Sequence, residues 1–515
     1  MTTSGFSMLC GAWLLCLAAG ASAHDVPAAA ALPNAGEVAF ENSGAAAAQP
    51  DFLYGLAQLH NFEYRLAAEA FRRAQQKDPG FAMAYWGEAM THNHPLWEQQ
   101  DLDAARAVLR RFAPGASQRL AAVRTEREKA YWRAMETLYG EGDKFERDRR
   151  HAAALRALHE QYPDDVDATC FYALALMGQS HEGRHLPSYM RAAALLQEVF
   201  ERRPRHPGAA HYLIHAVDDP THAPLGLRAA RAYSAIAPDA PHAQHMTSHI
   251  FIAMGMWDEV VRANETATRQ MERLRAERGR GPSACGHGYI WLSYGYLQQG
   301  RPAEAQRRVD ACADEAAHRA MLPAASDLLD SDSSSAGSFA TMRARYLIDS
   351  GEWDGPVARL SVDVSAVPIA EFERDFVDAF MALRREGRSP AREVVDRAQR
   401  SAARVTSALD AAGRSPTHPS RVALRIHLDE LEALWSWRRG ERDKALARLA
   451  KAAEDERAMP YEFGPPTIRK PAFELLGELL LEAGRQGPAR EAFEAALELA
   501  PGRAQSVAGL RRAGG

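Results

Sequence analysis

Small and large apolar residues recur at fixed intervals along this chain. The first copy is Gly55, Ala67, Phe71, Ala74 and Pro79, and the same intervals separate Gly477, Ala489, Phe493, Ala496 and Pro501. Such a pattern is typical of paired antiparallel helices. A small residue lets the two helices approach, a large residue fills the space beside it, and proline ends the second helix. The pattern therefore predicts an all-α protein built from helical hairpins.

Weaker copies of this pattern occur between the two ends. They are Gly255 with Val260, Asn264 and Ala267; Gly300 with Ala305, Val309 and Cys312; Gly351 with Trp353 and Leu360; and Gly440 with Ala445, Leu449 and Ala452. Further hairpins are expected at residues 82–112, 125–162, 167–203 and 209–237. The spacing is that of the tetratricopeptide repeat (TPR), so we expect a right-handed TPR-type solenoid of eight or more hairpins.

The chain divides into five predicted segments. An apolar run from Met8 to Ala19, followed by Ala-Ser-Ala at positions 21–23, predicts a signal peptide over 1–23, and therefore export to the periplasm or the medium. Residues 24–50 are rich in Ala and Pro and are expected to form a flexible leader. Two solenoid parts, 51–330 and 339–515, are predicted on either side of a Ser-rich break at 331–338.

Charge and composition exclude several classes of protein. The net charge of −5 is spread over 62 basic and 67 acidic residues, so no basic surface indicates a nucleic-acid partner. No stretch after residue 23 is long and apolar enough for a transmembrane helix. Zinc-protease, haem-attachment, phosphate-loop and serine-hydrolase motifs are missing, so classical enzyme chemistry is not indicated.

Histidines concentrate in the N-terminal half. Seven of the 19 lie between His206 and His249. The pairs His211/His215 and His245/His249 are each spaced i, i+4, which places two imidazoles on one helix face. Two such pairs on neighbouring helices can supply nitrogen ligands to zinc, copper, nickel or iron.

In TPR proteins certain positions of each first helix line a concave groove, and the repeat spacing places eight histidines there. They are His60, His92, His211, His215, His242, His245, His249 and His287. We expect the two i, i+4 pairs to converge in one pocket, with His242 and His287 at its edge and His60, His92 and His94 approaching from preceding turns. Asp218 and Asp219 are predicted as carboxylate ligands or as acceptors that orient a histidine.

Two blocks resemble a family of exported bacterial TPR proteins: AMAYWGEAMTHNHPLW at 82–97, and the histidine-rich segment at 211–259. The resemblance implies a TPR fold and sets these histidines apart from a generic repeat, but it implies no particular activity.

Two functions are compatible with the sequence. The first is an exported scaffold that binds a protein or peptide in its concave groove, with histidines supplying polar or pH-sensitive contacts. The alternative is a transition-metal-binding protein or metalloenzyme that holds zinc or copper in the histidine pocket, more weakly below about pH 6.5, where free imidazoles protonate. A single His-x-x-x-His pair more often packs in the helix interface than binds a metal, so the prediction of a metal site depends on the whole cluster. Two of Cys170, Cys285 and Cys312 can form a disulfide only if the fold brings them together.

Overall fold

The computed structural model describes residues 30–318, 334–385 and 392–514, except residue 33. The predicted signal peptide lies outside the described residues. Of the predicted break at 331–338, the part up to residue 333 also lies outside the described residues. From there the chain is ordered, because Ser334 caps a helix by accepting a hydrogen bond from the Gly337 amide at 3.0 Å.

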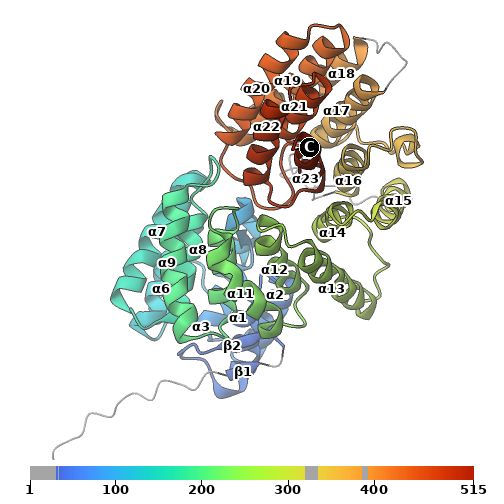
Figure 1. The fold of residues 1–515 in the computed structure, drawn as a ribbon. Helices are drawn as coiled ribbons and strands as arrows, with labels where there is room; N and C mark the ends of the chain where they lie inside the picture. The colour runs from blue at the N-terminus through green and yellow to red at the C-terminus, as the bar shows by residue number, and fades with distance from the viewer. Residues whose placement is uncertain (1–29, 33, 319–333, 386–391, 515) are drawn as a thin grey trace, which may run out of the picture.

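The structure is almost wholly helical (Figure 1). Its helices are α1 Gln49–His60, α2 Tyr64–Lys77, α3 Ala82–Met90, α4 Leu102–Phe112, α5 Ala116–Ala122, α6 Glu126–Leu138, α7 Lys144–Gln161, α8 Val166–Met177, α9 Leu186–Arg202, α10 Pro207–Val217, α11 Ala223–Ile236, α12 Pro241–Ala253, α13 Trp257–Glu277, α14 His287–Gln298, α15 Pro302–His318, α16 Ser335–Ser350, α17 Pro368–Arg384, α18 Glu393–Ala411, α19 Pro419–Arg438, α20 Arg442–Arg457, α21 Ala472–Glu482, α22 Gln486–Leu499 and α23 Ala504–Ala513. Short elements complete it: β1 Ala30–Leu32, β2 Gly36–Val38, β3 Asn93–His94, β4 Gln99–Gln100, and the 3-10 helices η1 Ala46–Ala48, η2 Pro95–Trp97 and η5 Val357–Arg359.

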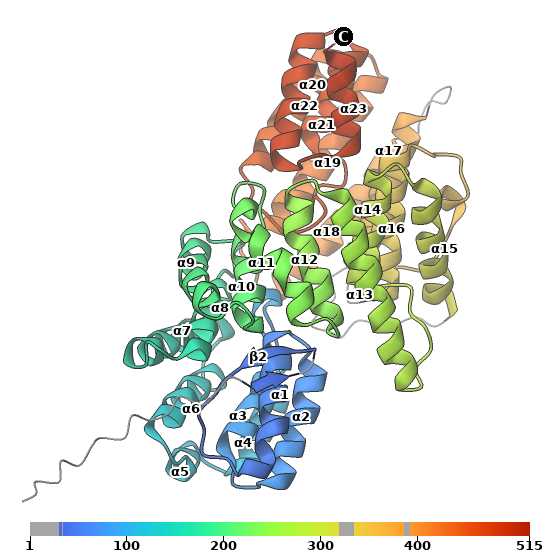
Figure 2. The same cartoon turned by 60° about the horizontal axis from the view of Figure 1, so that its bottom comes forward.

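Consecutive helices pack as antiparallel pairs, and the pairs stack in chain order. Figure 2 shows this succession from the blue N-terminal helices through α10–α14 to the red C-terminal ones. The predicted TPR-type hairpin solenoid is confirmed. The four hairpins expected between 82 and 237 correspond to α3/α4, α6/α7, α8/α9 and α10/α11. The weak copy at Gly351 departs from the pattern, because α16 is followed by η5 and not by a second long helix.

Glycine and phenylalanine act as the predicted small and large partners in the hairpins. A methyl group on Gly55 or Gly87 would lie 2.9 or 2.4 Å from the ring of Phe71. At the other end of the chain, Gly477 and Gly509 approach Phe493 in the same way. Only glycine leaves room for the ring at these helix crossings.

The segment before α1 was expected to be a flexible leader, but its described part is packed. β1 pairs with β2, and the ring of Phe40 lies 5.5 Å from that of Phe52 and 5.2 Å from that of Tyr131. The guanidinium of Arg127 lies over the ring of Phe40, 4.3 Å from its centre. One aromatic anchor thus gains enough buried contact to order a segment whose composition is otherwise that of a linker.

The C-terminal repeats return to contact the middle of the chain. Arg503 donates to Tyr294 on α14 at 3.1 Å and forms ion pairs with Asp349 and with Glu474. In Figure 1 the red helices accordingly lie next to α14 and α16. This return brings the loop at 458–471, between α20 and α21, to the histidine-bearing helices.

Two features bear on the environment of the protein. A disulfide joins Cys285 and Cys312, while Cys170 is buried and has a free thiol. Within the described ranges, no helix is both long and apolar enough to cross a lipid bilayer.

Candidate metal centre

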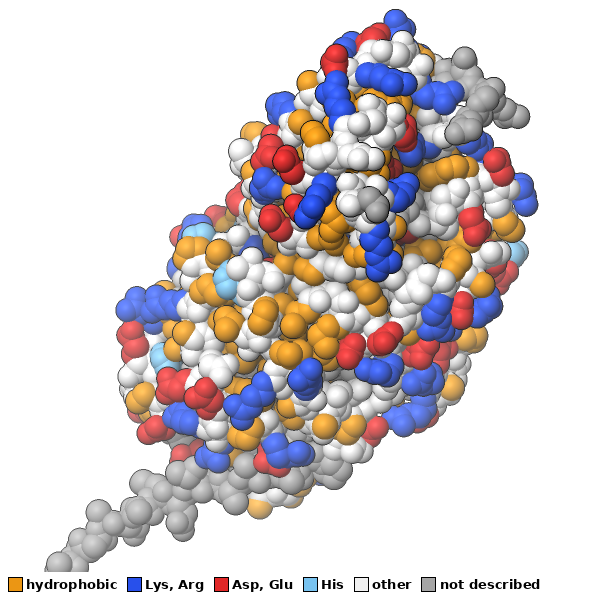
Figure 3. All heavy atoms as spheres, in the orientation of Figure 1, with side chains coloured by type: hydrophobic (Ala, Val, Ile, Leu, Met, Phe, Trp, Pro, Cys, Tyr) orange, Lys and Arg blue, Asp and Glu red, His pale blue; other side chains and the backbone are white. Residues whose placement is uncertain are grey.

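Six histidines meet on the first helices of three successive hairpins. His211 and His215 come from α10, His242, His245 and His249 from α12, and His287 from the first position of α14. We call them the six-histidine cluster. The side chains of the four predicted core members are buried: His211, His215, His245 and His249 are 0, 2, 4 and 1% exposed. Figure 3 shows only isolated histidines among mixed charges on the face in view.

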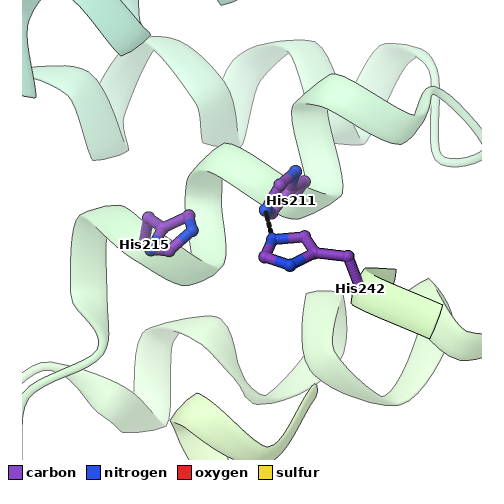
Figure 4. A group of neighbouring side chains, drawn as sticks. All are labelled: His211, His215 and His242. Atoms are coloured by element: carbon purple, nitrogen blue, oxygen red, sulfur yellow. Dashed lines mark hydrogen bonds between the residues drawn. The ribbon is translucent and has the colours of Figure 1, made fainter. Parts of the chain in front are cut away.

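The first set within the cluster is His211, His215 and His242. The Nε2 atoms of His211 and His242 lie 3.2 Å apart and point toward each other across the gap between α10 and α12 (Figure 4). The ring centre of His215 lies 5.0 Å from that of His211, one turn away on the same helix. One nitrogen from each of the three lies within 4.8 Å of the other two.

The second set is His245, His249 and His287. The Nε2 atoms of His245 and His249 also lie 3.2 Å apart. His287 approaches from α14, with its ring centre 4.7 Å from that of His245. One nitrogen from each of these three again lies within 4.8 Å of the other two.

The outward-facing nitrogens of three core histidines are held by hydrogen-bond acceptors. Nδ1 of His211 donates to the His60 carbonyl at 2.6 Å, Nδ1 of His245 to Oδ1 of Asn264 at 2.7 Å, and Nδ1 of His249 to Asp218 at 2.8 Å. A proton on Nδ1 leaves a lone pair on Nε2, so these bonds direct lone pairs into the cluster.

His215 contributes a further free nitrogen. Its Nδ1 lies 3.5 Å from the same oxygen of Asp218 that binds His249. Its Nε2 is buried and has no hydrogen-bond partner. A buried polar atom without a partner is costly, and this nitrogen is therefore available to a ligand.

Burial favours the neutral form of four imidazoles of the cluster. It lowers the pKa of His211, His242 and His245 well below the usual value, and neighbouring imidazoles lower it further. The pKa of His249 falls to about 4, although Asp218 opposes the effect of burial. Neutral imidazole is the form that binds metals.

Asp218 is held as a carboxylate. Burial alone would raise its pKa, but Arg184 at 2.8 Å and the two imidazoles lower it below its ordinary value. Arg184 also donates to the His215 carbonyl at 3.1 Å. The carboxylate charge is therefore compensated by arginine, and the cluster itself carries no net negative charge.

Aromatic rings enclose the six-histidine cluster. Trp291 stacks on His249 at 4.5 Å, and Phe62 lies 4.3 Å from His211. Phe463, from the loop at 458–471, lies 5.0 Å from His249 and 5.9 Å from His215. Gly464 allows this approach, because a methyl group there would lie 2.5 Å from the ring of Trp291.

Four predicted site residues lie outside the cluster. The His60 ring points away, and only its carbonyl contacts the cluster. His94 stacks on Tyr64 at 4.0 Å, and no contact joins His92 to the cluster in the described structure. Asp219 instead accepts from Thr221 and His222 at the start of α11. The repeat geometry is interrupted at two of these places. The turn between α3 and α4, which carries His92 and His94, is enlarged by β3 and β4, and Asp219 is engaged by the turn that leads into α11.

The His60 side chain belongs to a closed hydrogen-bond network. Its two nitrogens contact Tyr212 at 3.0 Å and Asp167 at 2.8 Å. His206 accepts from the Ala209 amide through Nδ1, so its Nε2–H donates to Asp167 at 3.3 Å. All four ring nitrogens already have a hydrogen-bond partner, and the network positions the His60 carbonyl that accepts from His211.

Three supporting residues were missed at the sequence level. Asn264 carried a signal, because it stands at the repeat position where other hairpins have Phe71 and Phe493. A polar side chain at a core position needs a partner, and here that partner is His245. Arg184 and Phe463 carried no such signal, since their roles depend on contacts between distant segments.

Comparison with known proteins adds little. No family model matches the chain, and no curated protein matches it. Among solved structures it is similar to the APC/C hetero-tetramer Cut9-Hcn1, with 11% identity, 92% of this chain and 78% of that chain covered, and a TM-score of 0.36. It is also similar to yeast Tom70, with 11% identity, coverage of 91% and 95%, and a TM-score of 0.31. At these values the likeness carries no argument about function.

Proposed function

We propose that the six-histidine cluster binds a transition-metal ion. The facing Nε2 atoms of His245 and His249 carry this proposal. Asp218 can only accept from His249. The orientation of Asn264 is fixed because its amide nitrogen donates to the Val260 carbonyl at 2.9 Å, so its oxygen accepts from His245. Both Nε2 atoms therefore bear lone pairs, which repel at 3.2 Å unless a cation lies between them.

The spacing of these nitrogens is that of ligands on one ion. With metal–nitrogen bonds of about 2.0–2.1 Å, two ligands of a tetrahedral ion lie about 3.3–3.4 Å apart. A proton shared by the two imidazoles is the competing occupant. Burial disfavours it, because the pKa of both histidines is lowered.

The ligand type favours zinc or copper. Imidazole nitrogens suit zinc, copper, nickel and iron, whereas magnesium and calcium require oxygen ligands. The acceptors on Nδ1 are also what metal-binding histidines normally have, because such bonds fix the tautomer and the ring orientation.

The test is a titration of untagged protein with zinc and with copper at neutral pH. His245→Ala/His249→Ala should abolish tight binding at this nitrogen pair, and so lower the metal content, while leaving helical circular dichroism largely intact. His92→Ala/His94→Ala is the matched control, since it also removes two histidines of the same half but lies outside the cluster. Equal affinity and equal metal content of the wild type and the His245/His249 variant would refute the proposal. Asn substitutions at both positions guard against a loss of binding caused by misfolding.

Partner binding is a second candidate function. At the cluster the groove is filled by Phe463 and its loop, so a protein or peptide would contact another repeat surface. A hollow between α18, α19 and α20 favours this. It is lined by the partly exposed Leu428 and by the charged side chains of Arg421, Arg425, Asp429, Glu432 and Arg448. If a partner binds in this hollow, replacing Arg425 and Arg448 with Glu should abolish its binding. The His245→Ala/His249→Ala variant should still bind the same partner.

Export of the mature chain is part of the same proposal. The apolar run and Ala-Ser-Ala at 21–23 support it, and so does the disulfide, because disulfides persist in oxidising compartments. N-terminal sequencing of protein from cell fractions should give His24 at or near the first position. Intact Met1 on cytoplasmic protein would contradict it.

A further inference from the structure

The two sets of three histidines are copies of one arrangement. His245 and His249 follow His211 and His215 by 34 residues, which is the length of one TPR. In each set an i, i+4 pair on one first helix is joined by a histidine from the start of the next first helix. His242 is the second residue of α12, and His287 is the first residue of α14.

Each set is complete by itself. The ligand atoms of either set lie within 4.8 Å of one another. A further group, His215, Asp218 and His249, takes one histidine from each set, but no such group of described residues combines His211 or His242 with His245 or His287. The facing Nε2 pair also occurs twice, at 3.2 Å in both sets. A single ion could not use both pairs, because they belong to different groups.

We infer that the cluster holds two metal ions, one in each set, and this inference rests on the metal binding proposed above. Three histidine ligands leave a coordination position of each ion open, as in catalytic zinc sites. An exogenous small ligand, such as water or hydroxide, would take that position on each ion.

Asp218 connects the two sites. One of its oxygens lies 2.8 Å from Nδ1 of His249 in the second set and 3.5 Å from Nδ1 of His215 in the first. The ring centres of these two histidines are 5.2 Å apart. A change at either ion alters the hydrogen bond to the shared carboxylate, so binding at one site should influence the other.

Metal stoichiometry tests this inference. Metal-free protein is saturated with zinc, freed of unbound metal by gel filtration, and assayed for zinc per chain. We expect two ions in the wild type and one in either His242→Asn or His287→Asn. Both histidines are only partly buried, so these variants disturb the core least. The double variant should lose both tight sites, and His94→Asn should keep two ions.

The metal content distinguishes a failure of the two-ion inference from a failure of metal binding itself. One ion in the wild type, lost equally in His242→Asn and His287→Asn, would overturn the two-ion inference and leave metal binding intact. No tight ion in the wild type would overturn metal binding itself. Circular dichroism of each variant identifies a loss caused by unfolding, and Gln substitutions then replace the Asn variants.

Discussion

The Nε2 atoms of His245 and His249 face each other at 3.2 Å, one turn apart on α12, while their Nδ1 atoms are bound by Asn264 on α13 and by Asp218 at the end of α10. Three helices from two hairpins thus hold two lone pairs together. The proposed metal ion would offset the cost of that arrangement, and this proposal leads to the predictions that follow.

Metal binding should persist to lower pH than for exposed histidines. The sequence alone suggests a loss below about pH 6.5, but burial lowers the pKa of His211, His242 and His245, and that of His249 to about 4. The neutral, metal-binding form therefore survives until the pH falls through these lower values. Zinc affinity measured at pH 7 and pH 5.5 should change by only a few-fold, whereas a hexahistidine peptide loses most of its affinity. A parallel loss in both would contradict this prediction.

Asp218→Asn should weaken metal binding about 10–100-fold, because it replaces the charged carboxylate that orients His215 and His249 with a neutral amide, which is a weaker acceptor. It also removes the closer of the two carboxylates beside the buried Arg184 and leaves only Asp219, at 3.8 Å, so the free energy of unfolding should fall. Titration and chemical denaturation measure the two effects. Asp219→Asn is the control, since Asp219 contacts Thr221 and His222 but no histidine of the cluster. Similar affinity losses in both variants would argue against a positioning role for Asp218.

Phe463→Ala should speed the release of metal to a chelator by several-fold. Phe463 covers His215 and His249, and the apolar shell of a metal site controls the access of water and of competing ligands. Stopped-flow transfer of zinc to a coloured chelator gives the rate. Phe145→Ala provides the comparison, because that ring stacks on His181 outside the cluster. An unchanged rate for Phe463→Ala would show that the loop does not limit release.

Reduction of the Cys285–Cys312 disulfide should destabilise the fold by about 3–4 kcal/mol, the chain-entropy estimate for a 27-residue separation. Because His287 lies two residues after Cys285, reduction should also weaken the second histidine set more than the first. Denaturation and zinc stoichiometry with and without reductant measure both effects. Cys170→Ala controls for thiol chemistry, and equal stoichiometry under both conditions would separate the disulfide from the metal site.

The sequence by itself determined the hairpin repeat and the core of the histidine cluster. Spacing identifies the residues that must be small or large where helices cross, as Gly55 and Phe71 show, because close packing leaves few alternatives there. The same periodicity placed the two i, i+4 pairs on neighbouring first helices. Local geometry was sufficient for these predictions, since a helix fixes which side chains share a face.

Only the tertiary structure decided how the cluster is finished. The repeat spacing placed His60 and His94 near the cluster, but their side chains do not join it. The His60 ring contacts Asp167, and the His94 ring stacks on Tyr64. Arg184, Asn264 and Phe463 reach the site from three separate segments, and the last of these comes from the C-terminal repeats. Burial, and with it the lowered pKa of the histidines, depends on those long-range contacts, which no local spacing along the chain encodes.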